Sequence, residues 1–208
     1  MSVEGKLIAA MDDRVRDPAS KLRHIDVCLT EPVEYTRSAG FERFEFVNEA
    51  LPELALAGLD LSTSLAGKRL RAPLMVAPMT GGTARGQAIN RRLAAVAERF
   101  GLAFGVGSQR VALESPERAE YFRVRDVAPS IPVFANLGAA QFARSYGATE
   151  ARRAVAMIGA DVLFVHFNAL QEAVQGGDRD FRDVARRLTQ LCRELAADGI
   201  PVFTREVC

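Results

Sequence analysis

The chain contains 208 residues, of which 49% are hydrophobic and 25% are charged, and its net charge is +1. These proportions are typical of a soluble globular protein, and the small net charge disfavours nucleic acid or an anionic membrane surface as a partner. No apolar run approaches the ~20 residues of a transmembrane helix, so we expect neither partner. An anionic ligand would need a local cluster of cations.

The first 70 residues show little regular periodicity, and we interpret residues 1–70 as an N-terminal extension. A proline at the first turn favours a helix that begins at Pro18 and ends before Glu31. Alternating apolar and charged residues predict a short strand over residues 41–47. Residues 59–70 predict a hairpin.

A regular alternation begins at Arg71. Short apolar runs predict five buried strands, at residues 73–78, 102–106, 132–135, 161–167 and 200–207. Amphipathic or proline-initiated stretches predict four helices, at residues 87–100, 116–124, 150–158 and 181–197. In the first of these helices the predicted core-facing residues are Ile89, Leu93, Val96, Ala97 and Phe100. In the last they are Val184, Leu188, Leu191 and Leu195.

Strands that alternate with helices predict a parallel sheet with helices packed outside it. The pattern fits both a (β/α)8 barrel and an open doubly wound sheet. A complete barrel takes about 250 residues, whereas only five strands fit between Arg71 and Cys208. In the barrel interpretation the fold class is α/β of the TIM-barrel family, with about the first five strands present, and residues 71–208 form the first half of the barrel.

Polar residues and glycines gather directly after the predicted strands. They are Thr80, Gly81 and Gly82, then Ser108, Gln109 and Arg110, then Asn136, then Asn168, Gln171 and Glu172, with Arg205 at the end of the fifth strand. Because the carboxyl ends of parallel strands share one mouth, these groups are expected to converge on a ligand site. His166 lies two residues before Asn168 and points to the same face of its strand.

Each of these groups has a functional and a plain structural interpretation. Arg110 offers a bidentate fork for phosphate, and Glu172 is a hard oxygen ligand suited to Mg2+. Taken singly, Glu172 is more often a solvated carboxylate, His166 a hydrogen-bonded core residue, and Gly81-Gly82 a turn. Their joint placement at strand ends favours the functional interpretation.

Cysteine usage and the N-terminus bear on the compartment. The three cysteines, Cys28, Cys192 and Cys208, are odd in number and far apart, which indicates reduced thiols and not a disulfide framework or a zinc site. The first residues lack a basic region and a long apolar region, so we expect no signal peptide and a cytoplasmic protein.

Four motifs carry a resemblance to a known family. They are Pro78-Met79-Thr80-Gly81-Gly82, Gly107-Ser108-Gln109-Arg110, Asn136-Leu137-Gly138, and the run HFNALQEAVQGGDRDF at residues 166–181. The last is long and specific, and the order of all four resembles that of the type 2 isopentenyl diphosphate isomerases. The resemblance extends from about residue 19 to residue 207.

The resemblance implies a (β/α)8 barrel that binds FMN and interconverts isopentenyl and dimethylallyl diphosphates. It implies Mg2+ and reduced FMN as cofactors, with NADPH supplying the reduction, and assembly into a homo-oligomer. The reduced flavin would serve as the acid–base group, which suits a site with no obvious pair of titratable residues.

The resemblance also implies a role for particular residues. The flavin would be contacted by Pro78, Met79, Thr80, Ser108, Asn136 and Arg205. The isoprenyl diphosphate substrate would be contacted by Lys21, Ser108, Gln109, Arg110 and Gln171. Glu172 would hold the metal, and the catalytic residues would be His166, Gln171 and Arg205.

The sequence departs from the family pattern at three points. An N-terminal Arg-Lys pair is replaced by Ser20-Lys21, with Arg23 nearby, and the usual Lys-Glu-Val-Gly becomes Arg205-Glu206-Val207-Cys208. Strands six to eight are absent, and with them the loops that usually hold a cofactor phosphate. We therefore expect the 208-residue chain alone to be inactive or weakly active.

Two other functions remain open at this point. One is a different FMN-binding barrel oxidoreductase, such as a relative of the 2-hydroxy-acid oxidases. The other is a non-catalytic half-barrel remnant. The Gln171-Glu172 pair favours the isomerase, while the missing strands favour the remnant.

Overall fold

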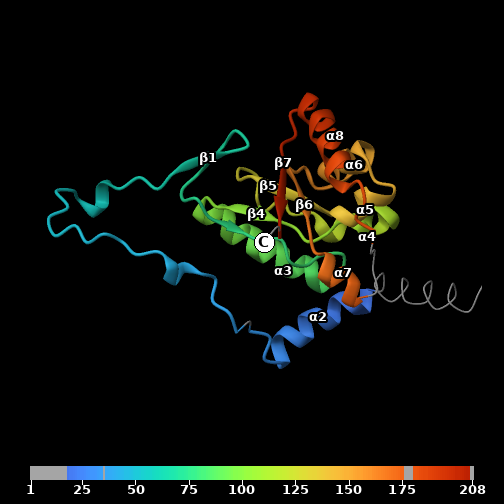
Figure 1. Cartoon of the computed structure of the whole chain (residues 1–208), viewed down its shortest axis with the longest axis horizontal. Coiled ribbons are helices and arrows are strands. Elements are labelled where there is room, and N and C mark those ends of the chain that lie inside the picture. Colours follow the sequence, from blue (N-terminus) through green and yellow to red (C-terminus); the bar gives the residue numbers. More distant parts are fainter. Residues whose placement is uncertain (1–17, 35, 176–179, 207–208) are drawn as a thin grey trace, which may run out of the picture.

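The computed structural model describes residues 18–34, 36–175 and 180–206. Its centre is a five-stranded parallel sheet in the order β3-β4-β5-β6-β7, so each strand pairs with its neighbour in sequence. The strands are β3 (Met75–Val76), β4 (Ala103–Gly105), β5 (Val133–Gly138), β6 (Val162–His166) and β7 (Val202–Arg205). The predicted α/β fold, a partial barrel of the TIM-barrel family, is confirmed (Figure 1).

The two faces of the sheet pack against different partners because side chains alternate along each strand. On β5, Val133, Ala135 and Leu137 join the core between sheet and helices, whereas Phe134 belongs to a second cluster on the other face. All six residues of β5 are buried, as expected for a strand covered on both faces.

Helices of two kinds follow the strands. The long ones are α3 (Ala84–Phe100), α6 (Ala148–Ile158) and α8 (Val184–Ala197). The shorter ones are α4 (Arg110–Glu114), the 3-10 helix η3 (Pro116–Phe122), α5 (Ala139–Arg144) and α7 (Ala169–Gln175). Thr83 caps α3, since its side chain accepts a hydrogen bond from the amide of Gly86, and Gly101 ends the helix at φ 65°. The prediction for α8 is confirmed: its four predicted core residues are buried.

A hairpin covers the end of the sheet opposite the polar strand ends. Strands β1 (Thr63–Leu65) and β2 (Lys68–Leu70) pair antiparallel, which confirms the predicted hairpin. Leu70 is buried with Phe134 and Phe164 in the second cluster. Lys68 Nζ lies 2.8 Å from a carboxylate oxygen of Asp161 and ties the hairpin to the sheet.

Several element predictions were wrong. Residues 41–47 form no strand: a 3-10 turn, η1 (Phe41–Arg43), is followed by residues without regular structure. Among the described residues no strand lies beside them, and an isolated strand cannot satisfy its backbone groups. A further 3-10 turn, η2 (Leu56–Gly58), lies in the same extended arm, which runs away from the sheet (Figure 1). Short helices α4, α5 and α7 were not predicted at all.

The predicted core face of the first long helix was also partly wrong. In α3 the buried residues are Gly86, Asn90, Ala94 and Ala97. Of the predicted set only Ala97 is among them, and Leu93, Val96 and Phe100 are exposed. Small residues face the sheet here, so the helix packs closely and its larger side chains lie outside.

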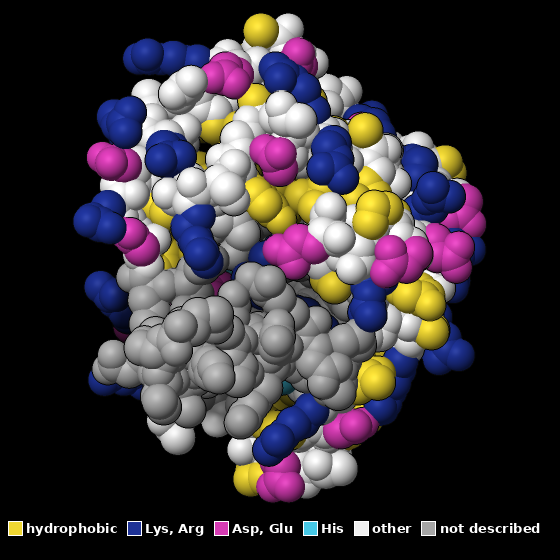
Figure 2. Space-filling model, turned by 90° about the vertical axis from the view of Figure 1, so that its right-hand side faces the viewer, with side chains coloured by type: hydrophobic (Ala, Val, Ile, Leu, Met, Phe, Trp, Pro, Cys, Tyr) yellow, Lys and Arg dark blue, Asp and Glu magenta, His cyan; other side chains and the backbone are white. Residues whose placement is uncertain are grey.

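Charges of both signs are interspersed over the face shown in Figure 2. In the described part of the chain, no helix has the length and apolarity needed to cross a bilayer.

Candidate functional site

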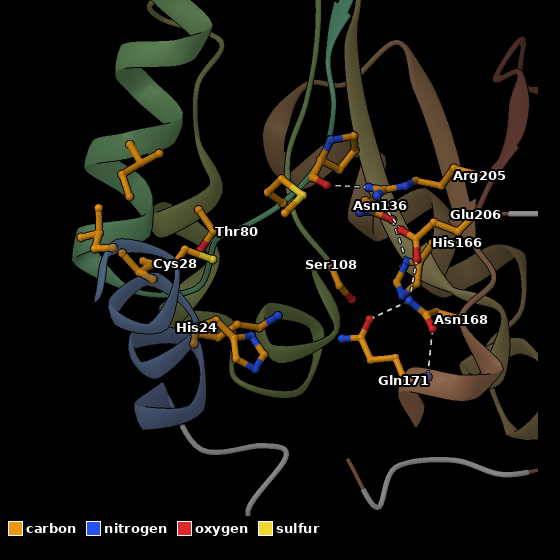
Figure 3. A pocket seen from close by; sticks show the side chains of 16 residues that line it. His24, Cys28, Thr80, Ser108, Asn136, His166, Asn168, Gln171, Arg205 and Glu206 are labelled. Carbon is orange, nitrogen blue, oxygen red and sulfur yellow. Dashed lines mark hydrogen bonds and ion pairs between the residues drawn. The ribbon is translucent and has the colours of Figure 1, made fainter. Parts of the chain in front are cut away.

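The carboxyl ends of the five strands open into a cavity of about 580 Å3, bounded on the far side by α2 (Pro18–Thr30) (Figure 3). The predicted helix at Pro18 is therefore confirmed, and it forms one wall of the site. The lining residues are Lys21, His24, Ile25, Cys28, Leu29, Pro78, Met79, Thr80, Ile89, Ser108, Asn136, His166, Asn168, Gln171, Arg205 and Glu206.

Most residues predicted from the sequence to form a site meet in this cavity. They are Lys21, Pro78, Met79, Thr80, Ser108, Asn136, His166, Gln171 and Arg205. Thr80, Ser108, Asn136, His166, Gln171 and Arg205 were grouped because parallel strand ends share one mouth, whereas Lys21, Pro78 and Met79 were assigned from the family resemblance. Gln109, Arg110 and Glu172 do not line the cavity.

His166 and Asn136 form a fixed pair on adjacent strands. The side-chain amide of Asn136 donates to the carbonyl of Val106 at 3.2 Å, which leaves its Oδ1 as an acceptor. His166 Nδ1 lies 2.9 Å from that oxygen and so donates to it, leaving Nε2 as an acceptor. Burial lowers the pKa of His166 to about 4, an effect that the nearby carboxylate of Glu206 only partly opposes. The imidazole is therefore neutral at pH 7.

Arg205 stands beside this pair because His166 and Arg205 are register partners on β6 and β7. Its Nη1 donates to the carbonyl oxygen of Pro78 at 2.6 Å, which links the fifth strand of the sheet to the loop after the first. Its Nη2 lies 2.5 Å from a carboxylate oxygen of Glu206. The carbonyl of Pro78 and the carboxylate of Glu206 therefore fix the position of the guanidinium at the inner edge of the cavity.

The loop after β6 is organised by Asn168. Its Oδ1 accepts the backbone N–H of Gln171 at 2.9 Å, and its amide donates to Gln171 Oε1 at 2.8 Å. These contacts begin α7 and set the position of Gln171 at the cavity (Figure 3). The next residue, Glu172, lies on the same helix.

The loop after β3 presents Thr80 at the cavity. Its carbonyl accepts hydrogen bonds from the amide of Gly107 and the side chain of Asn90, both at 2.9 Å. A Cβ at Gly107 would lie 2.5 Å from that carbonyl oxygen, so only glycine permits this approach. The Oγ1 of Thr80 is buried and has no hydrogen-bond partner among the residues that the structure describes. Buried hydroxyls usually have a partner, so this oxygen has unused hydrogen-bonding capacity.

The two glycines after Thr80 serve packing. A Cβ at Gly81 would lie 2.2 Å from the ring of Phe122, and Gly82 adopts φ 75°. They let the turn pack on the 3-10 helix η3, which is the plain interpretation.

Cations gather at one side of the cavity. Burial, and then the charge of Arg110, lower the pKa of Lys21, while Glu172 acts in the opposite direction. Arg110 begins α4, and its Nε lies 4.0 Å from Glu114. Two cations close enough to repel each other favour an anion bound beside them. Arg23, on the same helix as Lys21, is exposed and does not line the cavity.

Gln109 has a different role from the one expected. The residue is fully buried, and its side-chain amide donates to the carbonyl of Ala154 at 2.8 Å. The side-chain Oε1 of Gln109 accepts a hydrogen bond from the backbone N–H of Asn136 at 3.0 Å. The backbone N–H of Gln109 donates to the backbone carbonyl of Asn136 at 2.9 Å. The expected substrate contact is corrected to a structural one: beyond the end of β4, this side chain replaces a neighbouring strand.

We expect Gln109→Ala to lower the free energy of unfolding by about 2 kcal/mol, since it leaves the buried amide of Asn136 unpaired. Urea unfolding followed by circular dichroism measures this. Gln190→Ala, on the exposed face of α8, is the control and should change stability by under about 0.5 kcal/mol. Normal stability in Gln109→Ala together with weaker ligand binding would contradict the structural role.

Sequence reasoning missed the apolar wall of the cavity. Ile25, Cys28 and Leu29 project from α2, and Ile89 from α3. The signal was present: Lys21, Ile25, Cys28 and Leu29 recur at helical spacing. It could not be assigned to a site because nothing in the sequence says where α2 docks. In the structure an ion pair between Asp26 and Arg85, at 2.5 Å, ties α2 to α3.

No preformed metal centre is found in the described ranges, since no three His, Cys, Asp or Glu side chains cluster there. Glu172 would need oxygen ligands from another molecule to bind a cation. The side chain of Ser20 and residues 176–179 of the long motif lie outside what the structure describes, as do Val207 and Cys208.

Comparisons with known proteins agree with this geometry. A family model described as FMN-dependent dehydrogenase matches residues 23–123. The chain is 50% identical over 187 residues to an isopentenyl-diphosphate delta-isomerase of Xanthobacter autotrophicus, a match that covers 88% of this chain and 54% of that protein.

Two further relatives carry the same description. The Synechococcus isopentenyl-diphosphate delta-isomerase is 47% identical over 194 residues, covering 91% of this chain and 54% of its own length. The Deinococcus radiodurans protein is 46% identical over 189 residues, covering 90% and 55%. This chain is therefore a homologue of the isopentenyl-diphosphate delta-isomerases. It spans about half the length of the curated relatives it matches.

Proposed function

We propose that this chain carries a substrate and cofactor site for interconverting isopentenyl and dimethylallyl diphosphates. The observation that carries the proposal is the cavity at the strand ends, where a cationic side meets an apolar wall. Lys21, with Arg110 nearby, supplies the charge for a diphosphate, and Ile25 and Leu29 supply a surface for a short hydrocarbon. A ligand with both parts matches this combination.

The residues present fit FMN. Thr80 offers a buried hydroxyl without a partner, Ser108 lies beside it on the cavity, and Met79 presents an exposed apolar side chain. Arg205 adds a positive charge, which favours an anionic reduced flavin. Pro78 and Asn136 complete the proposed cofactor contacts. When bound, reduced FMN supplies the acid–base chemistry that moves the double bond.

The chain's own residues bind and orient the substrate. We assign the diphosphate to Lys21 and Arg110, and Mg2+ to Glu172 together with diphosphate oxygens. Gln171 is held at the cavity by Asn168, and its amide can bind the substrate. His166 is neutral, so its free Nε2 accepts a hydrogen bond; an anion bound nearby would favour its protonated form. Ser108 lines the cavity, and we assign it contacts to both FMN and the substrate.

Further parts of the proposal follow from the family resemblance. They are NADPH as the reductant, a cytoplasmic location, and a homo-oligomer. We also propose that residues 1–70 act as an extension that contributes substrate contacts, with residues 71–208 as the barrel part.

A second candidate is a non-catalytic half-barrel remnant. The open edges of β3 and β7 in the described sheet favour it, and so does Phe203, which is 39% exposed on the inner face. Unpaired edges also invite pairing with another chain.

Titration of the purified chain with FMN, followed by flavin fluorescence, tests the cofactor site first. Isopentenyl diphosphate with Mg2+ is then added to the reduced complex, and dimethylallyl diphosphate is measured. Binding and turnover support the isomerase, while binding without turnover supports the second candidate. An absence of FMN binding contradicts the isomerase site and supports the remnant.

Lys21→Ala is expected to weaken isopentenyl diphosphate binding about tenfold, because a charge-assisted contact to the diphosphate is lost. Isothermal titration of the chain with FMN and Mg2+ measures the change. Arg23→Ala removes a neighbouring cation that does not line the cavity and should leave affinity within about twofold. Equal losses in both variants would contradict the assignment and would support Arg23 as the substitute for the missing arginine at Ser20.

A further inference from the structure

Glu206 closes the inner rim of the cavity in an unusual backbone conformation. It follows β7 directly, and its φ is 58°, in the left-handed region that residues with a Cβ adopt infrequently. Such strain persists where surrounding contacts over-determine it, and it concentrates at functional sites. At Glu206 these contacts are made by the carboxylate, which binds Arg205 at the end of β7 and Asn168 after β6.

The two carboxylate oxygens are divided between these groups. Oε1 lies 2.5 Å from Arg205 Nη2, and Oε2 accepts a hydrogen bond from the side-chain amide of Asn168 at 2.8 Å. Arg205 also donates to the carbonyl of Pro78, and Asn168 also holds Gln171. A continuous chain of contacts therefore links the ends of β3, β7 and β6 through Glu206 (Figure 3).

We propose that Glu206 is a positioning residue that fixes Arg205 and Asn168 relative to each other, and through them the cofactor side and the substrate side of the cavity. Because both its oxygens are engaged within the protein, it acts through its two partners. The inference rests on the proposed function for its effect on FMN, although the contacts themselves exist without a ligand.

The arrangement explains why the left-handed backbone is retained. Arg205 and Glu206 are adjacent, and in an extended strand their side chains would point to opposite faces of the sheet. The turn at Glu206 brings its carboxylate back to the face that carries Arg205 and His166. An extended conformation here would place the carboxylate away from both of its partners.

Glu206→Gln tests the proposal, since it removes the charge with little change in size. The matched control is Glu194→Gln, where a carboxylate of α8 accepts a hydrogen bond from Gln190 at 2.7 Å, remote from the cavity. Two measurements are made on the 208-residue chain. One is the dissociation constant for FMN by fluorescence. The other is the side-chain amide NMR signal of Asn168 without ligand, assigned by its loss in Asn168→Ala.

We expect Glu206→Gln to weaken FMN binding about tenfold and to move the Asn168 amide signal, with neither change in Glu194→Gln. An unchanged Asn168 signal overturns the proposal, and so does a shifted signal with wild-type FMN affinity. If the wild-type chain binds no FMN, the proposed function fails, and the ligand-free NMR signal alone decides whether Glu206 positions Asn168.

Discussion

Asp161→Ala is expected to lower the free energy of unfolding by about 4 kcal/mol, because it removes the carboxylate that faces two cations and accepts a backbone amide. One carboxylate oxygen lies 2.8 Å from Lys68 Nζ. The other lies 2.7 Å from Arg125 Nη2 and accepts the amide of Val133 at 2.8 Å. One side chain thus joins the β1–β2 hairpin, the segment after η3 and the start of β5.

The titration of Asp161 agrees with this role. Burial alone would raise the pKa of Asp161, but the hydrogen bonds from Lys68, the Val133 amide and Arg125 outweigh burial, and the pKa lies below its ordinary value. A depressed carboxyl pKa contributes stability that is present above the unfolded pKa of about 3.9 and is lost as the pH falls through the folded pKa.

Urea unfolding at pH 7 measures the effect of Asp161→Ala. The control is Asp198→Ala, which removes the more exposed ion pair with Arg152 at 2.7 Å and should cost under about 1 kcal/mol. Similar losses in the two variants would show that Asp161 contributes no more than a surface ion pair.

His166→Asn should remove a large part of the acid sensitivity of this protein. Burial lowers the pKa of His166 to about 4 in the folded chain, against about 6.5 when unfolded. Between these values the unfolded chain binds more protons, so folding stability falls as the pH falls from 6.5 towards 4. For His166 alone the loss approaches about 3 kcal/mol. Asparagine keeps a donor for Asn136 and does not titrate.

The measurement is the free energy of unfolding at several pH values from 7 down to 4.5, for wild type and variant. The difference between the two curves isolates His166 from the carboxylates, which titrate in both. His24→Asn is the control, because His24 is more exposed than His166 and burial lowers its pKa less. If the free energy of unfolding falls equally with pH in wild type and in His166→Asn, a neutral, buried imidazole at His166 is contradicted.

The sheet and the polar rim of the cavity could be predicted from sequence for one physical reason. Buried parallel strands are short, apolar and regularly spaced, and their polar ends must share one mouth. That is why Thr80, Ser108, Asn136 and His166 could be grouped although they are far apart in the sequence. The same reasoning failed for Gln109, because a glutamine after a strand looks identical whether it faces a ligand or replaces a strand neighbour.

Other features depend on how distant segments of the chain pack together, which a local sequence pattern does not indicate. The apolar wall from Ile25 to Leu29 becomes part of the site only because α2 lies across the strand ends. Residues 41–47 alternate like a strand yet have no strand beside them in the described structure. In α3, the burial of Ala94 and Ala97 reflects the close approach of the sheet, which favours small side chains over the larger apolar ones nearby.

The stacked rings under the polar rim have an electrostatic consequence. Phe134 and Phe164 lie with centroids 4.5 Å apart, and Phe203 meets both edge-on, one side-chain layer below Asn136, His166 and Arg205. A layer of aromatic carbon polarises weakly and holds no water, so it screens the Arg205 charge poorly from below. The field at the cavity is therefore that of the Arg205–Glu206 ion pair, and this pair has more influence on a bound group there than it would on a wetted surface.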